Sequence, residues 1–123
     1  TLITSSAASD VYKRQGLVQG LSEAINFGQK AGLNMEDVIE VISKGAAQSW
    51  QMENRYKTML EDKFDFGFAV DWMRKDLKIA MEEAKNNGSL LPITEIIDKY
   101  YAEVQDMGGK RWDTSSLIKR FRK

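Results

Sequence analysis

The stretch FGFAVDWMRKDLKIA, residues 66–80, predicts a helix that is apolar on two sides. Its main stripe repeats every three or four residues and consists of Val70, Met73, Leu77, Ala80, Met81 and Ala84. At about 100° per residue, Lys75 points nearly opposite Leu77, between Trp72 and Ile79. A helix that is apolar on both sides is usually covered on both sides. The pattern therefore predicts that something charged docks beside Lys75, and the simpler alternative is a solvated helix face.

The composition excludes several classes of site. The chain has 123 residues, 42% of them hydrophobic, which suits one domain with a real core. Its 18 basic and 18 acidic residues balance, so charge favours neither nucleic acid nor a membrane surface. It contains no Cys and no His, which excludes disulfides, Ser-His-Asp triads and the usual zinc sites. We expect no metal and no transmembrane helix, and a cytoplasmic location.

The rest of the chain predicts further helices and no strand, because apolar residues recur at intervals of three and four. We expect an all-α bundle of five to six helices with one long N-terminal helix. The expected helices are about Val11–Lys30, a second one capped by Asn34, Ser49–Glu61, Phe68–Asn86, Pro92–Met107 and a short last one capped by Asp113 or Ser115. The expected buried residues outside the central helix include Leu17, Leu21, Ile25, Val38, Ile39, Val41, Ile42, Ile93, Ile96, Ile97, Tyr100 and Val104.

A row of small residues follows one side of the first helix at every fourth position: Gly16, Gly20, Ala24 and Gly28. Glycine inside a helix is about 0.5–1 kcal/mol less stable than alanine, so three glycines in one row suggest a compensating contact. The simplest such contact is another helix packed very close, within the bundle or across a dimer. The alternative is that the glycines are accidental in a tolerant helix.

Four segments stand in an order known from one protein family. They are SEAINFGQKAGLN, KGAAQSW, FDFGFAVDWMRKDLKIAMEEAKNNGSLLPIT and MGGKRWDTSSLI. Together they resemble the C-terminal domain of the β-hydroxyacid dehydrogenases, the family of 3-hydroxyisobutyrate dehydrogenase and 2-hydroxy-3-oxopropionate (tartronate semialdehyde) reductase. The resemblance covers about residues 16 to 121, and GF followed by KDL is its most specific part.

The resemblance implies a helical domain over residues 16–123, similar to the C-terminal domain of 6-phosphogluconate dehydrogenase. Such a domain closes over a Rossmann domain that binds NAD or NADP, and it makes a homo-oligomer. Lys75 would contact the bound dinucleotide, Asp76 would help to order the site, and Phe68 would line the pocket of the substrate and the nicotinamide. The alternatives are a snorkelling surface lysine, a helix-surface charge and a core aromatic.

The chain departs from the family at the general acid–base. In the family, a lysine in a K-x-x-N type motif on the first long helix moves the proton during hydride transfer to or from a small β-hydroxyacid. Counting back from Ser22 places Ala7 at the lysine position and Asp10 at the asparagine position, and neither replaces the original group. Lys13 lies too far along the helix to be equivalent. We therefore expect no catalytic residue here.

The segment SSAASDVYKRQ, residues 5–15, matches nothing in the family. It reads like foreign sequence joined to a truncated gene, so we expect residues 1–15 to be a non-native leader whose first ten or so residues pack poorly. The alternative is a natural N-terminal arm.

We therefore predict that the chain is a fragment of an NAD(P)-dependent oxidoreductase and is inactive by itself. Two other functions are alternatives to this prediction. One is a free-standing helical interaction or dimerisation module without catalysis. The other is nucleic-acid binding through the basic residues Lys119, Arg120, Arg122 and Lys123. The latter is poorly supported, because no aromatic platform or basic recognition helix accompanies these residues.

Overall fold

The computed structural model describes the backbone of residues 2–122 and the side chains of these residues except 2–9 and 11. Over this part the chain is all-α, as predicted, with a single isolated bridge between Ala69 and Asp113 in place of any sheet. The elements are α1 (Leu2–Lys30), α2 (Met35–Ile42), α3 (Trp50–Leu60), α4 (Val70–Asn87), α5 (Pro92–Asp106) and the 3-10 helix η1 (Thr114–Arg122).

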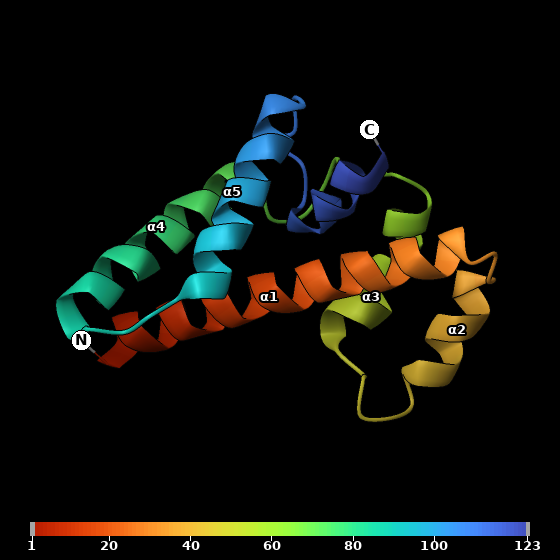
Figure 1. Cartoon of the computed structure of the whole chain (residues 1–123), viewed down its shortest axis with the longest axis horizontal. Helices are drawn as coiled ribbons and strands as arrows, with labels where there is room; N and C mark the ends of the chain where they lie inside the picture. The colour runs from red at the N-terminus through yellow and green to blue at the C-terminus, as the bar shows by residue number, and fades with distance from the viewer. Residues whose placement is uncertain (1, 123) are drawn as a thin grey trace.

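The long helix α1 is the axis on which the other helices pack (Figure 1). Helices α4 and α5 lie against its N-terminal half, and α2 and α3 lie against its C-terminal half (Figure 1). The core is divided in the same way. Val18 of α1 belongs to the cluster under α4 and α5, whereas Ile25 belongs to the cluster under α2 and α3. Helix η1 joins the two clusters, because Leu117 lies in the first and its neighbour Ile118 in the second.

The helix ends follow the local signals of the sequence. The side chain of Asn34 accepts a hydrogen bond from the backbone N–H of Asp37, and that of Ser49 accepts one from Met52. Gly88 ends α4 in the left-handed conformation, with φ of 80°. Pro92 is the first residue of α5, where its missing N–H is tolerated. These boundaries agree with the predicted ones to within two residues, except that α1 begins at Leu2 rather than Val11.

Several residues expected in the core are exposed, which corrects the sequence interpretation. They are Leu17 of α1, Val41 of α2, and Ile93 and Ile96 of α5. Helix α5 instead buries Ile97, Tyr101 and Val104, so Ile93 and Ile96 fall on its outer flank. The fully buried Tyr101 donates a hydrogen bond from its hydroxyl to the carbonyl oxygen of Thr114, at 3.1 Å, which joins α5 to η1.

The small-residue row of α1 is in close contact at one end only. A Cβ built on Gly28 would lie 2.1 Å from Sδ of Met35, because α2 folds back on the end of α1. At Gly16 the nearest atom, from Ile93, is 3.9 Å away, and nothing lies within 4 Å at Gly20. A close helix along the whole row within the chain is therefore wrong, and contact across a dimer stays a prediction.

The segment expected to be a foreign leader is helical from Leu2 onward. Within it, Tyr12 packs against the cluster under α4 and α5, and the buried Gln15 donates a hydrogen bond to Oγ1 of Thr94 at 3.1 Å. The side chains of Leu2 and Ile3, on which the prediction of poor packing depends, lie outside the described residues. The foreign origin of residues 1–15 stays a prediction.

Candidate functional site

The second face of α4, which the sequence pattern predicted to be covered by something beyond the bundle, is left uncovered by the described part of the chain. Trp72 is 60% exposed, and Lys75 and Ile79 are also exposed. Lys75 makes no hydrogen bond or ion pair with any described residue. The neighbouring cation Arg74, in contrast, makes a bidentate pair with Asp98 of α5, at 2.9 and 3.1 Å. Of these two adjacent cations, Arg74 therefore joins α4 to α5, whereas Lys75 makes no such pair with a described residue.

Phe68 lies at the start of this face, two residues before α4. Its half-buried ring meets the Trp72 ring edge-on, with centroids 6.4 Å apart and an interplanar angle of 82°. The guanidinium of Arg14 lies 5.7 Å from the same ring. Phe68 is therefore neither a simple core aromatic nor a free one. It joins α1 to the exposed stripe of α4.

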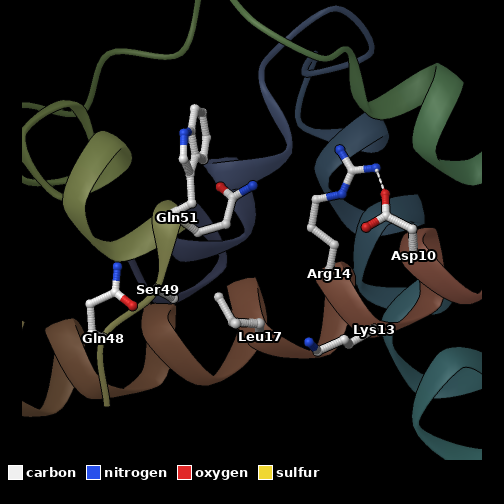
Figure 2. Close-up of a pocket in the computed structure, with 8 residues that line it drawn as sticks. Asp10, Lys13, Arg14, Leu17, Gln48, Ser49 and Gln51 are labelled. Carbon is white, nitrogen blue, oxygen red and sulfur yellow. Dashed lines mark hydrogen bonds and ion pairs between the residues drawn. The ribbon is translucent and has the colours of Figure 1, made fainter. Parts of the chain in front are cut away.

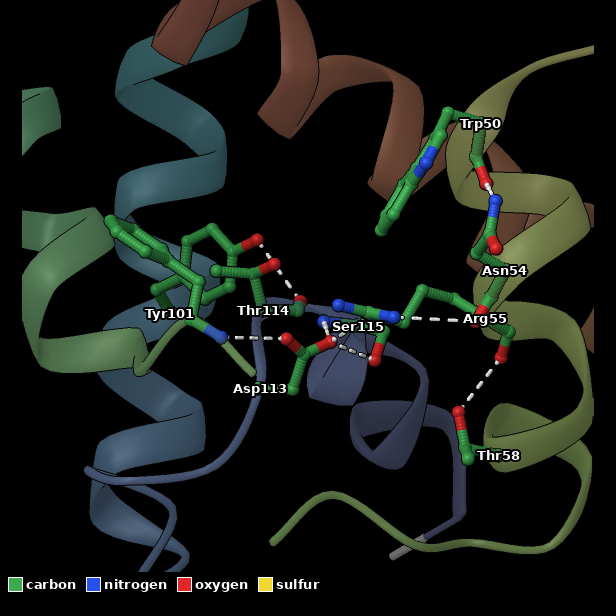
Figure 3. Close-up of polar contacts among 9 residues, drawn as sticks. Trp50, Asn54, Arg55, Thr58, Tyr101, Asp113, Thr114 and Ser115 are labelled. Atoms are coloured by element: carbon green, nitrogen blue, oxygen red, sulfur yellow. Dashed lines mark hydrogen bonds and ion pairs between the residues drawn. The ribbon is translucent and has the colours of Figure 1, made fainter. Parts of the chain in front are cut away.

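Asp113, which Figure 3 shows beside Ser115, binds the backbone of Phe68 through its carboxylate. Its carboxylate is only 1% exposed, and one oxygen accepts the backbone N–H of Phe68 at 2.9 Å. The other oxygen accepts the backbone N–H and the hydroxyl of Ser115, at 3.1 and 2.5 Å, and the Nε–H of Arg55 at 3.1 Å. A buried carboxylate that accepts several hydrogen bonds holds the donor groups in fixed positions. It ties α3, the loop before α4 and η1 together.

Arg55 extends this network to α3. Its guanidinium lies 4.9 Å from the ring centroid of Trp50 and 5.1 Å from that of Phe66, while its Nε–H binds Asp113. In Figure 3 the Arg55 side chain reaches from α3 toward Asp113, with Trp50 above it. The sequence predicted only that Asp113 or Ser115 caps the last helix, and it assigned Asp113 no other role. Its partner Arg55 carries no local signal, since the two are 58 residues apart.

A cavity of about 580 Å³ opens between α1 and the start of α3 (Figure 2). Its lining residues are Asp10, Lys13, Arg14, Leu17, Gln48, Ser49, Trp50 and Gln51. Arg14 and Asp10 form an ion pair at 2.8 Å on its α1 side. Since Arg14 also faces Phe68, the cavity and the α4 face meet at this residue. The volume lies in the range of about 300–1,000 Å³ that small-molecule sites occupy.

The structure gives the other predicted positions less support. Asp76 is half-buried on α4 and makes no hydrogen bond with any described residue, so its ordering role stays a prediction. The side chain of Ala7, at the family's lysine position, lies outside the described residues.

Within the described part of the chain, no group of His, Cys, Asp or Glu has an arrangement that could hold a metal ion. None of the described helices has the length and apolar character needed to cross a membrane.

The basic C-terminal segment pairs with acidic residues of the same chain. Lys119 and Arg122 both bind Asp62, at 2.8 and 3.1 Å, and Arg120 binds Glu103 at 2.9 Å. Burial raises the pKa of Asp62, but the hydrogen bonds from Lys119 and Arg122 outweigh it, so the pKa lies below the usual value. These pairs use three of the four cations proposed for a nucleic-acid surface, and the fourth, Lys123, lies outside the described residues.

Comparison with known proteins identifies this arrangement of helices. The model of the family described as "NAD-binding of NADP-dependent 3-hydroxyisobutyrate dehydrogenase" matches residues 16–121. The chain belongs to this family. The resemblance seen in the sequence is thereby confirmed, and so is NAD or NADP as the cofactor of proteins built with this domain.

Relatives of the 3-hydroxyisobutyrate dehydrogenase family extend the match. An uncharacterized oxidoreductase of Shewanella frigidimarina is 64% identical over 108 residues, which are 88% of this chain and 37% of the relative. The 2-(hydroxymethyl)glutarate dehydrogenase of Eubacterium barkeri is 36% identical over 100 residues, 80% of this chain and 33% of the relative. The chain thus spans about a third of the length of these relatives.

A solved structure of the same family shares the fold. The crystal structure of 3-hydroxyisobutyrate dehydrogenase from Salmonella typhimurium superposes with a TM-score of 0.86 at 23% identity. The superposition covers 95% of this chain and 41% of that one. The helical arrangement is therefore that of a 3-hydroxyisobutyrate dehydrogenase domain. The roles of Lys75, Phe68 and Asp76, and the division of the chain at residue 16, stay predictions.

Proposed function

We propose that this chain is the helical domain of an NAD(P)-dependent oxidoreductase acting on the CH–OH group of a small β-hydroxyacid. In the proposal, the domain closes over a Rossmann domain, contacts the cofactor through the α4 face and contributes to a homo-oligomer. The family match over residues 16–121 carries the proposal. The uncovered face of α4 supports it, because a domain that closes over a cofactor needs a face that its own chain leaves open.

The residues on that face fit a dinucleotide. Lys75 is an exposed cation with no acidic partner among the described residues, and it can pair with a phosphate or a ribose oxygen. Trp72 and Ile79 beside it are apolar and exposed, as a planar ring and a ribose would require. When bound, NAD(P) supplies the hydride acceptor or donor. The contribution of this chain is to bind and to orient.

The names of the relatives agree on one substrate chemistry. 3-Hydroxyisobutyrate and 2-(hydroxymethyl)glutarate both carry a hydroxymethyl group on the carbon next to a carboxylate. The reverse reaction of a 2-hydroxy-3-oxopropionate reductase would act on the same group. We infer that the substrate is a small acid of this type, with Phe68 against its apolar part and Asp76 ordering the site.

A second candidate is an interaction or dimerisation module without catalysis. The exposed side chains of Phe27 on α1 and of Ile93 and Ile96 on α5 favour it, since isolated domains bury most residues of this kind. This candidate predicts self-association without any effect of NAD(P).

A chimera separates the two candidates. Residues 16–121 replace the matching segment of the Shewanella frigidimarina relative, so that the relative supplies its own N-terminal part. The chimera should reduce NAD or NADP with a hydroxymethyl acid such as 3-hydroxyisobutyrate at a rate near that of the intact relative. The 123-residue chain by itself is the control and should show no turnover, because Ala7 cannot move the proton.

Two results would count against the enzyme proposal. One is a chimera that is folded by circular dichroism, inactive on every hydroxymethyl acid and unable to bind NADPH. The other is turnover that is unchanged when the whole matched segment is deleted from the relative. Either result would leave the interaction module as the better account.

A further inference from the structure

We infer that Trp72 is a stacking platform for the planar ring of one mononucleotide half of the cofactor, whose phosphate or ribose pairs with Lys75. The inference rests on the proposed function and adds to it a binding residue and the part of the ligand that it takes. Both mononucleotide halves of the cofactor have the same general chemistry, a heteroaromatic ring separated by one ribose from a phosphate.

Trp72 is ordered without being covered. Its side chain is 60% exposed, and the Phe68 ring supports it edge-on at a centroid distance of 6.4 Å. Phe68 is itself held by the bond from its backbone N–H to the buried carboxylate of Asp113. An indole that is already positioned loses little conformational freedom when a ring stacks on it. Its two faces are the natural place for a base, because every base has a π-face.

The spacing along α4 matches a mononucleotide. Lys75 is three residues after Trp72, about 4.5 Å further along the helix axis and on the same stripe. Ile79 continues this stripe one turn later and is also exposed. A ring on Trp72 therefore places the sugar and phosphate of the same nucleotide within reach of the flexible ammonium of Lys75.

The surroundings of the other two tryptophans differ from those of Trp72. A cation already lies over each: Arg55 is 4.9 Å from the Trp50 centroid, and Lys119 is 5.0 Å from the Trp112 centroid. No described cation lies over the Trp72 ring. Among the tryptophans of the described chain, Trp72 is the one without a cation over its ring, and it is 60% exposed. Trp112, half-buried under Lys119, is the internal reference.

The test uses the indole N–H signals of the ¹⁵N-labelled 123-residue chain in two-dimensional NMR spectra. The three signals are assigned with Trp50→Phe and Trp72→Phe. AMP and nicotinamide mononucleotide are titrated separately to millimolar concentration, followed by NADPH. The Trp72 signal should move and saturate with one of the two mononucleotides, which identifies the half that binds, while the Trp112 signal stays in place.

Variants complete the test. Trp72→Ala should weaken binding of that mononucleotide about tenfold, and Trp72→Phe should weaken it no more than about threefold, since a phenyl ring still stacks. Leu90→Ala, at an exposed apolar residue beyond the end of α4, should leave the affinity unchanged. A merely structural role of Trp72 would give equal losses for Trp72→Ala and Trp72→Phe.

Each remaining outcome is decisive. If the amide of Lys75 moves with a nucleotide but the Trp72 indole does not, the stacking platform is overturned and the proposed function stands. If no α4 signal moves with either mononucleotide or NADPH, the stacking platform is overturned, and the chimera decides the proposed function separately. If the Trp72 signal moves with protein concentration and not with nucleotide, this face is an interface between two copies of the chain, and the inference is wrong.

Discussion

The backbone of Gly67 packs directly on the buried carboxylate of Asp113. A Cβ built at Gly67 would lie 2.1 Å from Oδ1 of Asp113, the oxygen that accepts the backbone N–H of Phe68. Gly67 also has φ of 72°, in the left-handed region. This contact joins the loop before α4 to the residue that precedes η1. The loop that presents Phe68 closes only if residue 67 has no side chain.

Gly67→Ala should therefore destabilise the fold strongly. The left-handed conformation accounts for about 1–2 kcal/mol, and displacing Asp113 from the Phe68 N–H adds about 1–3 kcal/mol. The control is Gly88→Ala, which has φ of 80° but nothing within 4 Å, so that only the conformational part is lost. Urea denaturation of both variants measures the difference. Equal losses would show that the contact with Asp113 contributes nothing.

Asp62 should make the fold sensitive to acid. Its pKa in the folded chain is below the usual value of 3.8, because the bonds from Lys119 and Arg122 outweigh the opposing effect of burial. A carboxyl with a lowered pKa stabilises the fold above its unfolded pKa, and this stabilisation disappears as the pH falls through the lowered value.

Asp62→Asn isolates this effect. Residue 62 has φ of 59°, which Asn tolerates as well as Asp, so the backbone is not strained by the change. The wild-type chain should be the more stable of the two at neutral pH, and the difference should shrink below about pH 4. Thermal melts at several pH values provide the measurement. A difference that does not depend on pH would show that the charge of Asp62 is irrelevant.

Gly20→Ala should stabilise the isolated chain by about 0.5–1 kcal/mol, because alanine is the better helix residue and the site is open. The comparison is Gly28→Ala, where the new methyl meets Met35 and forces its flexible end to move. Melting temperatures test both.

Gly20→Leu separately tests a dimer contact at this row of small residues, and sedimentation measures the oligomer size. Loss of an oligomer with an unchanged monomer fold would show that a second copy of the chain packs against this row.

Lys75→Ala should weaken cofactor binding in the chimera with the Shewanella frigidimarina relative. A lost charge-assisted contact amounts to about 1.5–3 kcal/mol, or roughly ten- to a hundredfold in affinity. The helix should survive, because Lys75 is exposed and contributes little to the core. Lys85→Ala, an exposed lysine in the last turn of α4, is the matched control and should bind normally. Unchanged NADPH affinity in Lys75→Ala, with intact helicity, would show that Lys75 is a solvated surface lysine without a role in cofactor binding.

Most helix boundaries were predictable because their causes are local. Asn34 and Ser49 cap the N–H groups of residues three positions later, and Gly88 and Pro92 act through their own backbone. The buried stripe of α4 was predictable for the same reason, since one period of apolar residues places them on one side. The position of Lys75 between Trp72 and Ile79, opposite Leu77, follows from the same helical period.

The local sequence pattern could not predict which of several neighbouring apolar residues are buried in the core. Helix α5 offers Ile93, Ile96, Ile97 and Tyr101, and the position of α1 decides that the last two are buried. In the same way, Gly28 is crowded and Gly20 is open because α2 reaches only the end of α1. These outcomes depend on how far each helix extends along another, which the residues of one helix do not encode.

The sequence by itself therefore determined most of the helix boundaries, the family and the position of Lys75 opposite the buried stripe of α4. Only the tertiary structure placed Phe68, through a carboxylate 45 residues later in the chain, and joined that carboxylate to Arg55 of α3. The physical reason is that a buried charge is stable only where several distant donors converge on it, and such convergence exists only after the helices have packed.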